Sequence, residues 1–240
     1  MSFFESDAHA DAFSNSKTIH QLFELQSEKT PEHVAVTIDH AKITYAELNM
    51  RSNQLAHHLR KLQVGPDTLV GVCVNRSLEM VIGLLGILKA GGAYVPLDPA
   101  YLKEQLAIAL ADAKPALVLT KQHLLSHLPA GHITPFCLDT QWQAVTKYPI
   151  CNPGNLSKMD TLACVIYTND ASGKPKSLSL KIAALMKLIT LQINSERYNN
   201  GDKSEISLLA PFNSDLPFPE IFLTLYPINS LVWRENTWNI

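Results

Sequence analysis

Residues 88–113 read LKAGGAYVPLDPAYLKEQLAIALADA, and this stretch decides the fold of the 240-residue chain. Gly91 or its neighbour is expected to end a helix, because glycine is the usual residue just beyond a helix C-terminus. Residues 93–97 then form a short apolar run of the kind that makes a buried strand. Asp98 with the following proline supplies an N-cap and first turn for a helix over residues 101–113. A helix, a buried strand and another helix in succession predict an α/β fold.

The same alternation continues on both sides of this stretch. Residues 69–74 form a continuous apolar run, as expected when helices cover both faces of a parallel sheet. Capping patterns at Thr18, Thr44 and Ser77 each open an amphipathic helix, and Gly65 with its following proline is expected to end the second of them. The sequence therefore predicts layered, largely parallel sheets with helices on both faces. The other expected strands are residues 34–38, 42–44, 116–120, 135–138, 164–166, 206–210 and 230–233, and the remaining helical segments are residues 122–127, a turn near 142, and residues 182–193.

Composition narrows the classes of function. The net charge of −2 argues against a nucleic-acid or anionic-membrane partner. The apolar run near residues 80–88 is too short to span a membrane, and the N-terminus lacks the pattern of a secretory signal. Four cysteines without CxxC spacing, two of them in expected strands, indicate buried thiols in a reducing compartment and hence a cytoplasmic protein. The nine histidines follow no metal-ligand spacing and are expected at the solvated surface, so no metal site is predicted.

A polar segment, residues 168–177, follows the strand expected at 164–166. It carries Gly173 and two lysines, Lys174 and Lys176. Small residues and cations after a strand are suited to polyphosphate, because backbone N–H groups and ammonium groups both favour an anion. The segment is not a Walker-type loop, since proline rather than serine or threonine follows Lys174.

Three stretches resemble the adenylate-forming enzymes, and specifically the adenylation domains of nonribosomal peptide synthetases. Residues 167–177 read YTNDASGKPKS where that family carries YTSGTTGKPKG, with six of eleven positions identical. Residues 88–101 are similar to L-K-A-G-x-A-Y-V-P-I-D-P-x-Y, and residues 43–48 to L-T-Y-x-E-L. The resemblance covers about residues 18–233 and implies the N-terminal portion of the family's large domain, with ATP and Mg²⁺ as ligands. It implies a phosphate-binding loop that includes Thr168, Ser172, Gly173, Lys174 and Lys176.

One departure from the family pattern bears directly on ATP. The first glycine of the family's loop falls on Asp170, which places a carboxylate where that loop approaches the phosphates. Two like charges about 5 Å apart at an effective dielectric near 20 repel by roughly 3 kcal/mol. Each 1.4 kcal/mol is about tenfold in affinity, so Asp170 alone is expected to lower ATP affinity by orders of magnitude.

A fourth stretch resembles the family's substrate end. Residues 212–225 read FNSDLPFPEIFLTL, similar to F-D-x-S-x-W-E-I-F. The alignment places Asp215 at the family aspartate that pairs with the α-amino group of the amino-acid substrate. A carboxylate is a sound partner for an ammonium group. Pro217 and Pro219 depart from the family pattern beside it.

Composition and the resemblance together predict a domain organisation. Residues 1–17 are expected to be a flexible leader, residues 18–233 a truncated adenylation-domain portion, and residues 234–240 an unrelated tail. The central portion is divisible into two subdomains, residues 18–155 and 156–233. We find no counterpart of the family's adenine-binding N-x-Y-G-P-T-E segment, its Y-x-T-G-D segment or its lid with the catalytic lysine, and no catalytic residue is assigned.

Four hypotheses follow. The leading one is a truncated, degenerate adenylation domain, inactive alone, that serves as a scaffold or docking piece beside a peptide synthetase. The second is one half of a split amino-acid-adenylating enzyme, completed by a partner chain. The third is an apolar surface that drives homodimerisation or binding to a carrier or condensation domain. The fourth is the product of a decayed gene.

Overall fold

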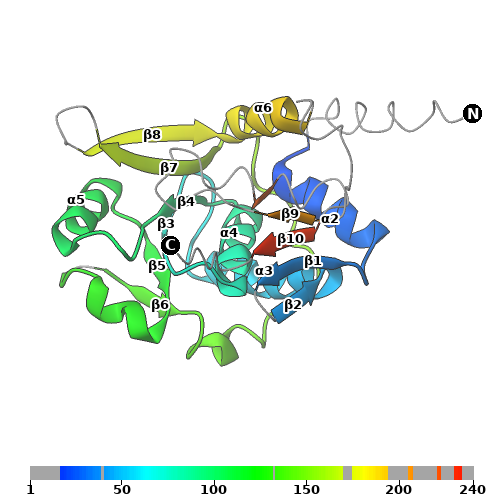
Figure 1. Cartoon of the computed structure of the whole chain (residues 1–240), viewed down its shortest axis with the longest axis horizontal. Helices are drawn as coiled ribbons and strands as arrows, with labels where there is room; N and C mark the ends of the chain where they lie inside the picture. Colours follow the sequence, from blue (N-terminus) through cyan, green and yellow to red (C-terminus); the bar gives the residue numbers. More distant parts are fainter. Residues whose placement is uncertain are drawn as a thin grey trace, which may run out of the picture.

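The computed structural model describes residues 17–38, 41–131, 133–169, 175–193, 205–207, 221–222 and 230–233 (Figure 1). Within these residues the larger sheet consists, in spatial order, of β6 (Pro135–Cys137), β5 (Leu117–Thr120), β3 (Leu69–Cys73), β4 (Ala93–Pro96), β7 (Leu162–Asn169) and β8 (Pro175–Lys181). Every neighbouring pair is parallel except β7 and β8, which are antiparallel. β4 and β5, which follow β3 in the sequence, lie on opposite sides of it, so the strand order reverses direction at β3 as in doubly wound α/β sheets.

The smaller sheet joins the two ends of the described chain. In the same residues it consists of β2 (Ala41–Thr44), β1 (Val34–Ile38), β10 (Ser230–Trp233) and β9 (Glu205–Ser207), in that order. β1 pairs antiparallel with β2 and parallel with β10, through partners such as Val36 and Leu231. The strands expected at residues 34–38, 42–44 and 230–233 are therefore confirmed.

Helices cover both faces of the larger sheet. They are α2 (Ile19–Lys29), α3 (Tyr45–Lys61), α4 (Leu78–Ala90), α5 (Lys103–Ala113) and α6 (Ile182–Ile193), with the short 3₁₀ helices η1 (Gln122–His127) and η2 (Trp142–Ala144). α5 lies on one face, where Leu106 shares a core with Val95 and Val118. α3 and α4 belong to a larger core on the other face, which also includes side chains of the smaller sheet. The predicted α/β fold with helices on both faces is confirmed. None of the described helices is both long and apolar enough to cross a membrane.

Local capping chemistry sets several helix boundaries as expected. The side chain of Ser77 accepts a hydrogen bond from the Met80 N–H at 3.4 Å, and that of Thr44 from the Glu47 N–H at 3.2 Å. Gly91 ends α4 at φ 98°, a left-handed conformation that side-chain-bearing residues avoid. Three of the capping residues named from the sequence therefore act where they were expected.

Two expected helix boundaries are wrong. α5 begins at Lys103, and the Asp98 carboxylate instead accepts the Ala100 N–H at 2.8 Å, which closes a turn before the helix. α3 ends at Lys61 rather than at Gly65, because the chain already turns at Gln63, whose φ is 65°. In both cases a local turn lies between the helix and the residues that mark its expected boundary, Asp98–Pro99 for the start of α5 and Gly65–Pro66 for the end of α3.

Polar side chains of α3 hold an irregular segment, residues 146–154, that leads towards β7. Gln54 donates to the carbonyl of Thr146 at 2.8 Å and Asn53 to that of Ile150 at 2.7 Å. Arg60 donates to the carbonyl of Gly154 at 2.6 Å. These bonds give partners to backbone carbonyls in a segment that lies outside the strands and helices of the described chain.

A buried lysine links this segment to the helices. Lys89, 1% exposed, donates from Nζ to Oε1 of Glu24 at 2.5 Å and to Oδ1 of Asn49 at 2.8 Å. Its Nζ also lies 3.5 Å from Oδ1 of Asn152. α2, α3, α4 and the irregular segment therefore meet at one ammonium group, and its burial is compensated by ionic and polar partners.

The predicted surface location of the histidines is wrong for His20, which is 2% exposed. Its Nε2 lies 3.1 Å from Oδ1 of Asn155 and 3.0 Å from the Thr18 hydroxyl, so the buried ring is paired as a neutral imidazole. Burial, and then the nearby charge of Lys89, lower the pKa of His20 to about 3.

This lowered pKa predicts a loss of stability in mild acid. The unfolded chain binds a proton at His20 near the ordinary histidine pKa of 6.5, whereas the folded chain resists protonation down to about 3. Stability is therefore fully present above about pH 6.5 and falls as the pH decreases, by about 2 kcal/mol between pH 7 and pH 5. Urea unfolding at the two pH values measures this, and His20→Gln, which keeps a polar side chain, should remove most of the difference. An unchanged pH dependence in that variant would assign the loss to other groups.

Candidate functional site

The segment expected to bind phosphate lies at the end of an antiparallel hairpin formed by β7 and β8. The register pairs Thr168 with Lys176 and Tyr167 with Ser177. Thr168 and Lys176 are thus cross-strand neighbours on one face, and Lys176 is exposed. A hydroxyl and an ammonium group side by side at the end of a strand pair supply two of the hydrogen-bond donors that an anion site needs.

The expected loop is shorter than the sequence suggests. The prediction of a polar loop over residues 168–177 is wrong at both ends, because β7 continues to Asn169 and β8 begins at Pro175. Residues 175–181 read PKSLSLK, in which Leu178 and Leu180 alternate with serines, and this period of two suits a strand. Only residues 170–174 connect the two strands.

Five residues named from the sequence for these sites lie outside the part of the chain that the structure describes. Ser172, Gly173 and Lys174, like Asp170, lie outside the described residues, and so does Asp215. Of the phosphate-site candidates, the structure therefore brings together Thr168 and Lys176. Among the described residues no group of three or more histidine, cysteine, aspartate or glutamate side chains forms a possible metal site.

Tyr167 connects this hairpin to α5, a contact that sequence reasoning did not predict. Its hydroxyl donates to Oδ2 of Asp112 at 2.5 Å, and its ring packs beside the α5 core. Burial and then the Asp112 carboxylate raise the pKa of Tyr167. The two residues are 55 positions apart, so no local pattern could indicate the pair.

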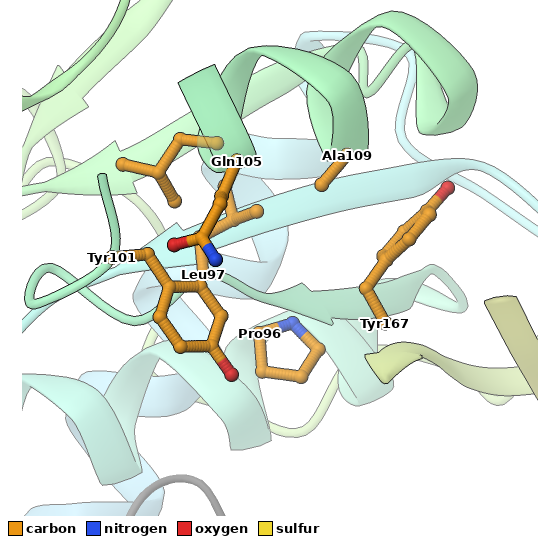
Figure 2. A pocket seen from close by; sticks show the side chains of 7 residues that line it. Pro96, Leu97, Tyr101, Gln105, Ala109 and Tyr167 are labelled. Carbon is orange, nitrogen blue, oxygen red and sulfur yellow. The ribbon is translucent and has the colours of Figure 1, made fainter. Parts of the chain in front are cut away.

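A small pocket lies between α5 and Tyr167 of this hairpin (Figure 2). Figure 2 shows Tyr101 and Tyr167 on opposite sides of it, with Pro96 between them. Its volume is about 30 Å³, which is enough for only a few ordered water molecules. The pocket is therefore too small for a nucleotide or an amino acid. Its lining residues are Pro96, Leu97, Tyr101, Gln105, Leu106, Ala109 and Tyr167.

Lys89, one of two lysines in residues 88–113, is not available to a ligand. Its side chain has no exposed surface and is bonded to Glu24. Burial lowers its pKa to about 8, and the Glu24 carboxylate opposes that shift. The function of Lys89 is therefore structural, whereas Lys176 of the candidate site is exposed.

Comparison with known proteins places the chain among its relatives. A family model described as AMP-binding enzyme matches residues 23–235. A component of the linear gramicidin synthase of Brevibacillus parabrevis is 38% identical over 224 residues, which are 93% of this chain and 4% of that protein. Tyrocidine synthase 3 from the same organism is 40% identical over 207 residues, 86% of this chain and 3% of that protein. The chain thus spans a small part of the length of these relatives.

Solved structures show the same fold. The nonribosomal peptide synthetase FmoA3, in its AMPPNP-bound form, superimposes with a TM-score of 0.81 at 25% identity, over 91% of this chain and 23% of that one. The N-terminal subdomain of Klebsiella oxytoca NpsA gives a TM-score of 0.78 at 21% identity, over 91% of this chain and 55% of that one. At 21% identity, the comparison with NpsA shows similarity of fold only.

Proposed function

The chain belongs to the AMP-binding enzyme family and is homologous to the adenylation domains of nonribosomal peptide synthetases, and from this premise we propose that its β7–β8 hairpin carries a weakened ATP-phosphate site. The supporting observation is Asp170, which follows β7 directly where the family's loop has a glycine. With that site weakened, the chain forms no aminoacyl adenylate on its own. It serves instead as a scaffold or docking piece for other domains of a peptide synthetase.

The residues present fit the phosphates of ATP in part. Thr168 and exposed Lys176 are paired across the hairpin and offer one hydroxyl and one positive charge. Ser172, Gly173 and Lys174 would complete the loop, with Mg²⁺ as the accompanying ion. When bound, ATP supplies the activated phosphorus that an amino-acid carboxylate attacks. Asp170 lowers the affinity of these residues for phosphate, because its carboxylate repels the same anion that the lysines attract.

Two further assignments belong to the proposal. Asp215 is the candidate partner of a substrate amino group, because a carboxylate stabilises an ammonium ion. The cytoplasm is the proposed compartment, since all four cysteines lie in the described part of the chain and are free thiols. Cys73, Cys137 and Cys164 are buried, which suits stable reduced thiols.

Replacing Asp170 tests the weakened site. Asp170→Gly removes a negative charge and restores the family's residue, so the affinity for ATP should rise at least tenfold, given that a roughly 3 kcal/mol repulsion corresponds to about a hundredfold. Isothermal titration calorimetry of the 240-residue chain with ATP, with and without Mg²⁺, measures this. The unchanged chain should give a dissociation constant weaker than about 1 mM, which corresponds to about 4 kcal/mol of binding free energy.

Matched variants separate the causes. Asp170→Asn removes the charge but not the side chain, so it should recover the electrostatic part of the gain. Lys176→Ala in the Asp170→Gly background should reduce the affinity again. Micromolar, Mg²⁺-dependent binding by the unchanged chain would show that Asp170 does not weaken the site and would overturn the proposal. ATP–pyrophosphate exchange by the unchanged chain with any amino acid would overturn the claim of inactivity.

A further inference from the structure

The β7–β8 hairpin is weakly held by the sheet beyond its base. β4 pairs with β7 through Tyr94 and Cys164, and it ends at Pro96, which has no N–H to donate. Among the described residues, residues 165–169 of β7 pair with residues 175–179 of β8, as an extension of the sheet two strands wide. Figure 1 shows this end of the hairpin extending over α5. Such a pair has little stability of its own in water.

The bond from Tyr167 to Asp112 reaches across to α5 at this weak point. It joins the part of the hairpin beyond Cys164 to a different element of the fold. Figure 2 shows the Tyr167 side chain beside α5, with its hydroxyl directed away from Tyr101. The acceptor is a carboxylate, and hydrogen bonds to charged groups are stronger than neutral ones.

We propose that Asp112 is a positioning residue that, through Tyr167, fixes the outer part of the β7–β8 hairpin and with it the ends of the strands that carry the loop of residues 170–174. Thr168 directly follows Tyr167, and Lys176 pairs with Thr168, so a shift at Tyr167 moves both candidate phosphate contacts. Asp112 acts on both contacts through its bond to the Tyr167 hydroxyl. The consequence for ATP rests on the function proposed above, whereas the anchoring of the hairpin does not.

Hydrogen exchange measured by mass spectrometry tests the anchor without any nucleotide. Tyr167→Phe and Asp112→Ala should each speed amide exchange in residues 165–168 and 176–179 at least fivefold, while exchange in β3 and β5 stays unchanged. Asp112→Asn keeps an oxygen that accepts the Tyr167 hydroxyl and should restore most of the protection. Because both single changes remove the same bond, the double variant should exchange no faster than either one.

Controls make the result decisive. Asp139→Ala removes an exposed carboxylate that follows β6 at the opposite side of the sheet, and it should leave the hairpin unchanged. Unaltered exchange in Tyr167→Phe, or equally fast exchange in Asp112→Asn and Asp112→Ala, would overturn the proposal. In the Asp170→Gly background, Tyr167→Phe should lower ATP affinity at least threefold. If Asp170→Gly binds no ATP, the proposed function fails while the exchange result still decides the anchor.

Discussion

Replacing Lys89 with methionine is expected to lower the free energy of unfolding by about 3–5 kcal/mol, because one partner of a buried ion pair is removed and the other stays. The Glu24 side chain is only 15% exposed and would lose the ammonium group 2.5 Å away. Asn49 would lose a donor at 2.8 Å. Natural domains are stable by about 5–15 kcal/mol, so this one change should remove a large part of the total.

Urea unfolding followed by circular dichroism measures the loss. The double variant Glu24→Gln with Lys89→Met removes both charges, so it should be clearly more stable than Lys89→Met alone. Lys147→Met is a control in which a surface lysine, 5.7 Å above the Tyr148 ring, is lost without a buried partner. A loss below about 1 kcal/mol in Lys89→Met, or no recovery in the double variant, would contradict the role assigned to the pair.

The burial of Lys89 also shows where sequence patterns stop being informative. A lysine in the last turn of a helix normally reaches solvent and favours the negative end of the helix dipole. α4, however, is buried over all of residues 80–90, so its last turn has no solvent to reach. The partner that neutralises Lys89 is Glu24, 65 positions earlier, and no local pattern connects the two.

By contrast, the strands and helices of the larger sheet are predictable because their signals are local. These signals depend only on residues close together in the sequence. They are the continuous apolar runs at β3 and β5 and the capping residues Thr44 and Ser77. The candidate site is less predictable, because its geometry depends on contacts between residues far apart in the sequence. Its motif residues can be named from the chain, whereas the bond from Tyr167 to Asp112 depends on how α5 packs against β7.

β8 is an intermediate case. Leu178 and Leu180 alternate with serines in a strand pattern, but lysine, serine and proline give the same segment the composition of a loop. Pairing with β7 decides the outcome, since seven register partners join the two strands. Lys176 and Lys181 on this edge also disfavour pairing with a further strand, as charged residues do on natural sheet edges.

The second large effect concerns two glycines on α4 that differ in what surrounds them. A Cβ added to Gly86 would lie 2.8 Å from Cδ2 of Leu55, a core residue of α3, whereas one added to Gly83 would lie 3.4 Å from Cδ1 of Leu119, an ordinary contact. Both changes to alanine gain about 1 kcal/mol of helix propensity. Only Gly86→Ala also overpacks the core, at a cost of typically 1–3 kcal/mol.

Gly83→Ala is therefore expected to be neutral or slightly stabilising, and Gly86→Ala to be less stable than Gly83→Ala by about 1–3 kcal/mol, in chemical denaturation under identical conditions. Helix propensity is the same for both, so it cancels in the comparison and the difference reports the close approach of α3 and α4 alone. Leu55→Ala combined with Gly86→Ala provides a cross-check. The shorter side chain makes room for the new Cβ, so the two changes should cost less together than the sum of their separate effects. Equal stabilities for the two alanine variants would mean that α3 moves away from α4 at little cost, and the tight contact at Gly86 would then not be a source of stability.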